Sequence, residues 1–233
     1  MLNALCISDL QCPFEHKHAF DFACHVEKTF FPEVKPRVFN LGDEVDQHTL
    51  SKWGSNPNGM SAKAEFEEAK LRLKPWMERW PTMRICISNH TYRYMKKAYA
   101  AGIPDGFMKT VGEAYDAPKG WLWADRWIAD KVLFEHGEMV SGPLAAIRAA
   151  HQNRMNTVIG HQHTNGGVIF NSSAWDTIWA MNTGCLIDIN QYAFDYGRIL
   201  RNKPTLGMGV IVEGTPCFVP MWLDKDGNWL GRI

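Results

Sequence analysis

Residues that can bind a metal ion or transfer a proton recur along this chain, and each group directly follows a short apolar run. The groups combine carboxylates, amides and imidazoles: Asp9, Gly42-Asp43, Asn89-His90, His136 and the segment GHQH at 160–163. In an open α/β sheet, the loops at the carboxyl ends of neighbouring strands meet in one crevice. We therefore expect these groups to form a single site, although they lie far apart in the sequence.

This mixture of hard and borderline ligands indicates the kind of metal. Carboxylates, amides and imidazoles together suit Mn²⁺, Fe or Zn²⁺ better than Mg²⁺ alone. Two cations held about 3.5 to 4 Å apart need a carboxylate between them to screen their repulsion. Asp43 is the natural bridge. The residues predict two divalent metal ions, with Mn²⁺ favoured and Fe or Zn²⁺ as alternatives.

The elements that must position these residues alternate in the first half of the chain. Strands are expected over 2–8, 37–41 and 83–88, with helices over 16–28 and 62–80 between them, which indicates an α/β fold. Later apolar runs have fewer helices between them, which favours antiparallel pairing; they are 131–135, 156–159, 168–170, 177–181, 208–212 and 217–223. Trp175 and Trp179 are expected in the core.

The composition is that of one globular domain over residues 1–233. Of these residues, 45% are hydrophobic and 21% are charged, and 25 Lys and Arg balance 25 Asp and Glu. A chain of this length can bury roughly 70% or more of the surface that its unfolded state exposes. The neutral balance argues against binding to nucleic acid or to acidic membranes through a broad basic field.

The cysteines and the first residues favour a cytoplasmic location. Six cysteines are scattered without a CxxC pair, so we expect them to be reduced. The sequence opens MLNALCISD, without the basic and hydrophobic regions of a signal peptide, and no apolar run approaches the roughly 18 residues of a membrane span. We expect no association with a membrane.

The order of the strand-end groups resembles that of the calcineurin-like metallophosphoesterase superfamily, over residues 1 to about 185. The family carries DxH, GDxxD, GNH followed by Asp or Glu, a lone metal-binding His, and GHxH. GDEVD at 42–46 and GHQH at 160–163 match in full, and Asn182-Thr183-Gly184 is similar to the family's NxG segment. Each motif alone is weak, but their shared order makes the resemblance strong. Compact members of this kind are often encoded by phages and bacteria.

The resemblance implies a four-layer αββα sandwich, in which helices flank two mixed β-sheets and the metals lie at the carboxyl ends of strands. It also implies two ligand sets. Metal 1 would be held by Asp9, Asp43 and His163 with Gln11 as a fourth ligand, and metal 2 by Asp43, Asn89, His136 and His161.

The resemblance further implies how a phosphoester would be cleaved. A hydroxide that bridges the metal ions would be the nucleophile, and the cations would neutralise charge on the phosphoryl oxygens. His90 would protonate the leaving oxygen as general acid, and Asp46 would hold the His90 imidazole. Arg93 would contact a phosphate oxygen, or would be a solvated residue on a helix face.

Two positions depart from the family pattern. Gln11 stands where the family has the His of DxH, so metal 1 would have an amide ligand or water there. Three outcomes are open: a looser site, a shell completed by His16 or His18, or one tightly held ion. Thr91 replaces the acidic residue after GNH, and Ser88 replaces its Gly.

The substrate depends on the segment between the third and fourth motifs. Residues 91–130 are rich in Gly, Pro and Trp, and we expect a cap-like insertion over the metals. Trp121, Trp123 and Trp127 would pack this cap or offer a stacking platform for a base. Two small basic clusters favour a nucleotide or nucleic-acid diester as substrate; they are Lys96-Lys97 and Arg198, Arg201 and Lys203.

Three functions follow as expectations. The first is a metal-dependent hydrolase of phosphodiester bonds, and the second is a phosphomonoesterase acting on nucleotides or proteins. The third is a binding scaffold of the same fold that has lost catalysis, motivated by Gln11 and Thr91. The sequence does not indicate an oligomeric state.

Overall fold

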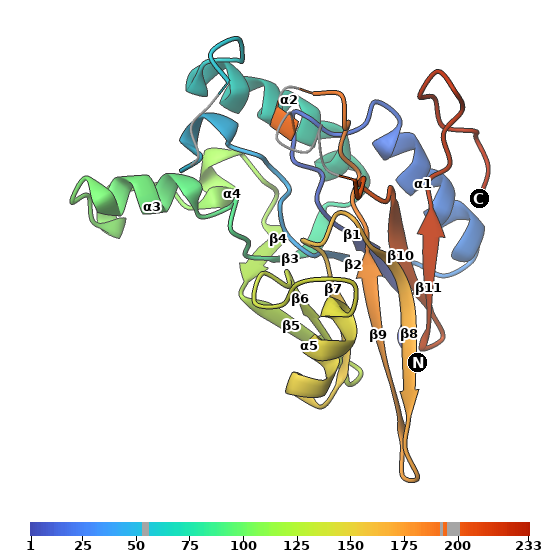
Figure 1. Ribbon diagram of the computed structural model, residues 1–233. Coiled ribbons are helices and arrows are strands. Elements are labelled where there is room, and N and C mark those ends of the chain that lie inside the picture. The colour runs from blue at the N-terminus through green and yellow to red at the C-terminus, as the bar shows by residue number, and fades with distance from the viewer. Residues whose placement is uncertain (53–55, 192, 195–200) are drawn as a thin grey trace.

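The first half of the chain builds most of a six-stranded sheet. The computed structural model describes residues 1–52, 56–191, 193–194 and 201–233 (Figure 1). The sheet order is β11-β10-β1-β2-β3-β4. Strands β1 to β4 are parallel, whereas β10 pairs antiparallel with β1 and β11 pairs antiparallel with β10. The strands are β1 (Ala4–Ile7), β2 (Arg37–Asn40), β3 (Thr82–Cys86), β4 (Gly120–Ala124), β10 (Gly207–Val212) and β11 (Thr215–Pro220).

The second half of the chain builds a five-stranded sheet with the order β5-β6-β7-β9-β8. Its three central strands are parallel and its two edge strands are antiparallel to their neighbours. Both sheets are therefore mixed. The strands are β5 (Arg126–Ala129), β6 (Val132–Glu135), β7 (Asn156–Ile159), β8 (Gly166–Ser172) and β9 (Thr177–Thr183).

Helices cover the outer faces of the two sheets. Helices α1 and α2 lie against the six-stranded sheet, and α5 lies against the five-stranded sheet (Figure 1). The side chain of Ser61 caps α2 by accepting from the Ala64 N–H. The helical segments are α1 (Ala19–Phe30), α2 (Ala62–Arg79), α3 (Arg93–Ala100), α4 (Val111–Ala114) and α5 (Ala145–Asn153), with 3-10 turns η1 (His48–Leu50) and η2 (Asp105–Phe107).

The alternation of side chains along each strand creates the four layers. In β1, Leu5 packs into the core under α1 and α2, whereas the next residue, Cys6, packs into the core between the sheets. The aromatic rings of Phe39 and Phe134 stack between the sheets with centroids 3.8 Å apart. This is the predicted αββα sandwich, so the expected fold class is confirmed.

Residues 91–130, which we predicted as a cap, divide into two parts. Residues 91–119 carry α3 and α4 and lie beside the sheets, whereas 120–129 form β4 and β5, an edge strand in each sheet. The Trp121 indole N–H donates to the Trp80 carbonyl at 2.7 Å, and that of Trp127 donates to the Ile85 carbonyl at 3.0 Å. These two aromatic residues therefore anchor the edge strands, and the segment outside the sheets is shorter than predicted.

The expectation for the two later tryptophans was right for one and wrong for the other. Trp179 in β9 is buried, but Trp175 lies in the turn between β8 and β9 and is 95% exposed. The turn lies at the end of the β8–β9 hairpin, which reaches beyond the other strands of its sheet (Figure 1), so no second layer covers it. Within the described ranges, every helix falls short of the length and apolar character that crossing a membrane requires.

Candidate metal centre

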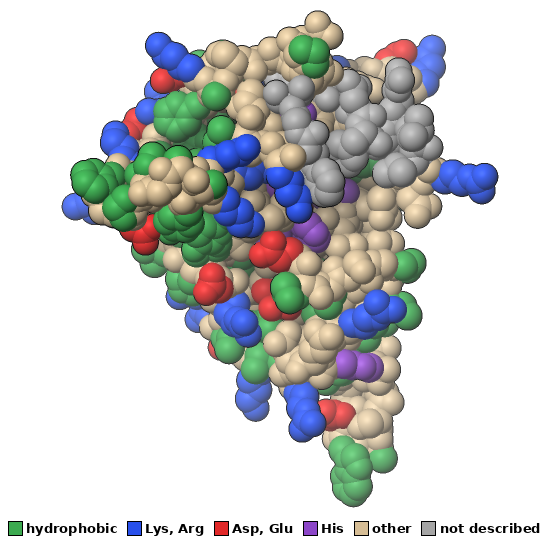
Figure 2. All heavy atoms as spheres, turned by 60° about the vertical axis from the view of Figure 1, so that its left-hand side comes forward, with side chains coloured by type: hydrophobic (Ala, Val, Ile, Leu, Met, Phe, Trp, Pro, Cys, Tyr) green, Lys and Arg blue, Asp and Glu red, His purple; other side chains and the backbone are tan. Residues whose placement is uncertain are grey.

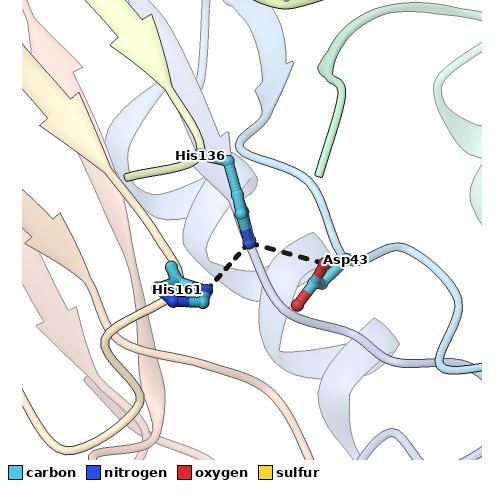
Figure 3. Close-up of side chains that lie close together, drawn as sticks. All are labelled: Asp43, His136 and His161. Atoms are coloured by element: carbon cyan, nitrogen blue, oxygen red, sulfur yellow. Dashed lines mark hydrogen bonds and ion pairs between the residues drawn. The ribbon is translucent and has the colours of Figure 1, made fainter. Parts of the chain in front are cut away.

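The predicted site residues come together at one edge of the sandwich. Asp9 and Asp43 follow β1 and β2, Asn89 follows β3, and the histidines follow β6 and β7. Figure 3 shows the side chains of Asp43, His136 and His161 directed toward one another. Two groups of three ligand residues form there, and within each group the ligand atoms lie within 4.8 Å of one another.

The first group consists of Asp43, His136 and His161. The His136 Nε2 atom lies 3.5 Å from Asp43 Oδ1 and 3.1 Å from His161 Nδ1. The side-chain oxygen of Asn89 lies 3.0 Å from the same nitrogen. These are the four residues that the resemblance assigned to metal 2.

The hydrogen bonding of His136 fixes which of its nitrogens faces this group. Its Nδ1 atom lies 2.7 Å from the Leu41 carbonyl oxygen, which only accepts, so Nδ1 carries the proton. The Nε2 lone pair therefore points at the Asp43 carboxylate and the Asn89 oxygen. Lone pairs that converge in this way fit a cation. Metal-binding histidines usually donate their other ring N–H to a carbonyl or carboxylate, as His136 does to Leu41.

The second group consists of Asp9, Asp43 and His163, so the Asp43 carboxylate belongs to both groups. The His163 Nε2 atom lies 2.9 Å from Asp9 Oδ1. Asp9 Oδ2 accepts from the Ser8 hydroxyl and, at 2.9 Å, from the His161 N–H, which fixes the carboxylate. The donor set of two carboxylates and one imidazole also fits a divalent cation.

Gln11 borders the second group as predicted. Its Nε2 atom lies 3.2 Å from Asp43 Oδ2 and 3.4 Å from His163 Nε2. Its Oε1 atom is buried and has no hydrogen-bond partner among the described residues. Because an amide can be turned about its last bond, the Gln11 oxygen can instead be directed at the group, where it would be a ligand for a bound cation.

The histidines proposed to complete the Gln11 side of the shell are engaged elsewhere. His16 Nε2 lies 3.1 Å from the Gly227 carbonyl oxygen. His18 Nδ1 lies 3.9 Å from Asp21 Oδ2 on α1. Neither histidine belongs to the two ligand groups found among the described residues.

Neighbouring charges set the ionisation of the second group. Burial raises the pKa of Asp9, but the charge of His163 and its hydrogen bond outweigh burial, so the pKa lies below its ordinary value. Burial lowers the pKa of His163, yet the Asp9 carboxylate outweighs it and the pKa is raised. The two side chains thus favour an ion pair, which a cation would replace.

The first group responds differently. Burial would raise the pKa of Asp43, but His90 and His136 attract its charged form and hold the pKa well below the ordinary range. Burial, followed by repulsion from His136, lowers the pKa of His161. A charged carboxylate beside an imidazole that favours its neutral form, as His161 does, suits a divalent metal.

The backbone is bent sharply at these residues. Asp9, Gln11, Asp43 and His161 have φ values of 50°, 49°, 54° and 64°, in the left-handed region that residues other than glycine rarely adopt. At Gly42, φ is 104° and a Cβ atom would lie 2.7 Å from that of Ser88, so only glycine fits. Strained backbone of this kind concentrates at functional sites.

A separate set of side chains surrounds His90. Its Nδ1 atom lies 3.1 Å from Asp46 Oδ1, as expected for a carboxylate that holds the ring. Arg93 donates to the same carboxylate oxygen at 2.7 Å, and its Nη2 atom lies 2.8 Å from His90 Nε2. The Arg93 side chain is 19% exposed, so it is neither fully solvated nor free of partners.

Sequence reasoning missed Glu44, the central residue of GDEVD. Glu44 is buried and accepts from the Trp123 indole N–H at 3.0 Å. The Thr91 hydroxyl lies 3.3 Å from its other carboxylate oxygen. Burial raises the pKa of Glu44, and the bond from Trp123 partly offsets this effect. The sequence did contain a signal for this role: Glu44 is a charged residue within the GDEVD motif, and a buried charge needs a hydrogen-bond partner.

Comparisons with known proteins identify no close relative. No family model and no curated protein matches the chain. Among solved structures, Vps29 of Chaetomium thermophilum is 10% identical with a TM-score of 0.45, and the match covers 98% of this chain and 90% of that one. The nuclease MPE of Pseudomonas putida is 11% identical with a TM-score of 0.36, covering 93% and 87%. At these values neither similarity identifies an activity.

The fold rests instead on the chain's own residues. Helices flank two mixed sheets, five motifs end neighbouring strands in the expected order, and two ligand groups share one carboxylate. This arrangement agrees with the αββα sandwich that the resemblance to the calcineurin-like metallophosphoesterases implies.

Proposed function

We propose that this protein is a metal-dependent phosphoesterase that hydrolyses phosphodiester bonds in a nucleotide or nucleic-acid substrate. The observation that carries the proposal is the shared carboxylate of Asp43, which belongs to both ligand groups. A carboxylate between two such groups is what a pair of cations requires. We also propose a cytoplasmic location, because the six cysteines are scattered along the sequence without a CxxC pair.

The chain's residues would divide the work as follows. The first group with Asn89 would hold one cation, and the second group with Gln11 would hold the other. Bound divalent cations, with Mn²⁺ favoured, lower the pKa of water and neutralise charge on phosphoryl oxygens. His90, oriented by Asp46, would donate a proton to the leaving oxygen from Nε2, after Arg93 has moved away and Nε2 has taken up a proton from solvent.

The choice of a diester is supported by charge near this site. Lys96 and Lys97 are exposed on α3, the helix that begins with Arg93. Arg201 and Lys203 are also exposed, whereas Arg198 lies outside the described residues. Clusters of this size suit the phosphates of a nucleotide or a short strand better than a long duplex.

Hydrolysis assays test this proposal. Metal-stripped protein is titrated with Mn²⁺ and given bis(p-nitrophenyl) phosphate or p-nitrophenyl phosphate, with Asp43→Asn and His136→Ala as variants. We expect Mn²⁺-dependent cleavage that favours the diester and falls to background in both variants. Asp176→Asn, an exposed position in the β8–β9 turn, is the matched control and should keep full activity. Equal activity in wild type and Asp43→Asn would overturn the proposal, and preference for the monoester would change the substrate class.

Gln11 favours one alternative function, a scaffold without catalysis. An amide is a weaker metal ligand than the family's imidazole, so Gln11 would lower the metal affinity of the second group. Gln11→His separates the two functions. A large gain in Mn²⁺-dependent hydrolysis indicates a weakened but working site, whereas the absence of hydrolysis in both forms favours the scaffold.

A further inference from the structure

A cavity of about 790 Å³ lies between α3, α4 and β4. Its walls are mostly apolar and include three aromatic residues, Tyr92, Trp121 and Trp123, together with Met95 and Leu122. Hydrophobic side chains gather over this side of the molecule (Figure 2). Cavities of roughly 300 to 1,000 Å³ with apolar walls are typical of small-molecule sites.

The wall of the cavity includes residues that adjoin the candidate active site in the sequence. Thr91 and Tyr92 form part of its wall and directly follow His90. Consecutive Cα atoms are about 3.8 Å apart, so the wall begins within roughly 4 to 8 Å of the His90 backbone. On the other side, the indole N–H of Trp123 donates to Glu44, the residue after Asp43.

The polar groups at the rim do not favour a cation as the ligand. Glu113 accepts from Thr110 in a capping box at the start of α4. Asp116 pairs with Lys70 at 2.5 Å. Both acidic side chains at the rim are thus engaged, and the walls that remain offer ring faces and aliphatic surface.

These walls suit a flat aromatic ring. The bond from the Trp123 indole to the buried Glu44 fixes the orientation of that ring. Every nucleobase has a flat face that can stack on an aromatic side chain, whichever base it is. Because His90 would protonate the leaving oxygen, the part of the substrate nearest this wall is the leaving group.

We infer that this cavity binds the base of the nucleotide on the leaving side of the phosphodiester. The inference rests on the proposed function for the assignment to the leaving side, whereas the binding of a base depends on the cavity alone. The two can therefore be tested separately.

The test is the binding of adenosine, which has no phosphate, to the metal-stripped full-length chain by calorimetry or ligand-observed NMR. Met95→Trp and Leu122→Trp fill the cavity from opposite walls, one on α3 and one on β4. Ala100→Trp adds the same ring to an exposed position on α3 outside the cavity and is the matched control. Circular dichroism confirms that each variant is folded.

We expect adenosine to bind wild type and Ala100→Trp alike, and to bind each filled variant at least about tenfold more weakly. Failure of adenosine to bind wild type, or equal binding to wild type and both folded filled variants, overturns the inference. Binding to the cavity in a protein without hydrolytic activity keeps the base site and overturns only the proposed function.

Discussion

The guanidinium group of Arg93 contacts His90 on the nitrogen that would meet a leaving group. Its Nη2 atom lies 2.8 Å from His90 Nε2, while Nη1 donates to the Asp46 carboxylate at 2.7 Å. Because arginine only donates, Nε2 must accept, and the imidazole proton is then on Nδ1 beside Asp46. Arg93 thus orders the ring and must move before Nε2 can act on a substrate.

Replacing Arg93 therefore affects turnover more than substrate binding. We expect Arg93→Ala to lower kcat by roughly tenfold, less than the roughly 10²–10⁴-fold that a general acid itself contributes, because Arg93 only orders the ring, with KM changed less than about twofold. Steady-state kinetics on the diester measure both constants. Lys63→Ala removes an exposed cation from α2, to which no role in the site is assigned, and should change neither. A raised KM with an unchanged kcat would instead make Arg93 a phosphate-binding residue.

Gln11 limits the affinity of the second group. Gln11→His adds an imidazole next to Asp43 and His163, so we expect the weaker of two Mn²⁺ sites to bind roughly tenfold more tightly. Calorimetry with metal-stripped protein measures both affinities. His18→Gln alters an imidazole outside both groups and should leave them unchanged. An unchanged weaker site in Gln11→His would remove Gln11 from the ligand shell.

Metal uptake should depend on pH through His163. Asp9 raises the pKa of His163 above its ordinary value of 6.5 against the effect of burial, so a proton occupies the ligand atom up to a higher pH. The protonated pair stabilises the metal-free fold below the ordinary pKa, and this contribution is lost as pH rises through the raised value. We expect Mn²⁺ affinity to rise with pH across this window and protons to be released on binding. Calorimetry in buffers of different ionisation enthalpy counts those protons. Equal Mn²⁺ affinity below and above the pH range in which His163 loses its proton would contradict this prediction.

The two sheets depend on the stacked pair Phe39 and Phe134. Both rings are fully buried between the sheets, so Phe134→Ala should lower the free energy of unfolding by about 3–5 kcal/mol. Trp175→Ala removes a larger ring that is 95% exposed and should change it by less than about 0.5 kcal/mol. Urea unfolding followed by circular dichroism measures both variants, and similar losses would contradict the exposure of Trp175.

Much of the fold was predictable because the apolar runs are short and the motifs end them. Asp9, Asp43 and His136 each mark the end of a buried strand, and parallel strands bring their carboxyl ends together. Strands β4 and β5 were not predicted because their tryptophans interrupt the alternation, and indole N–H groups bonded to Trp80 and Ile85 stabilise them. Those partners are distant in sequence, so no local pattern reveals them.

The sequence predicted the candidate metal ligands better than the residues that hold them in place. GDEVD and GHQH place Asp43 and His161, but the partners of Arg93 and Glu44 depend on how α3 and β4 pack. Glu44 in particular accepts a hydrogen bond from the Trp123 indole, which is 79 residues away in the sequence. Such long-range contacts between a motif and its surroundings follow from tertiary packing rather than from spacing.

The most direct test of the central claim is the number of Mn²⁺ ions that the chain binds with and without the shared carboxylate. Calorimetry and electron paramagnetic resonance on metal-stripped protein measure stoichiometry and coupling between the ions. We expect two ions in wild type, loss of the weaker one in Asp9→Asn, and weakening of both in Asp43→Asn, because only Asp43 belongs to both groups. Binding of a single ion by wild type, or equal losses in Asp9→Asn and Asp43→Asn, would contradict a dinuclear centre built on Asp43.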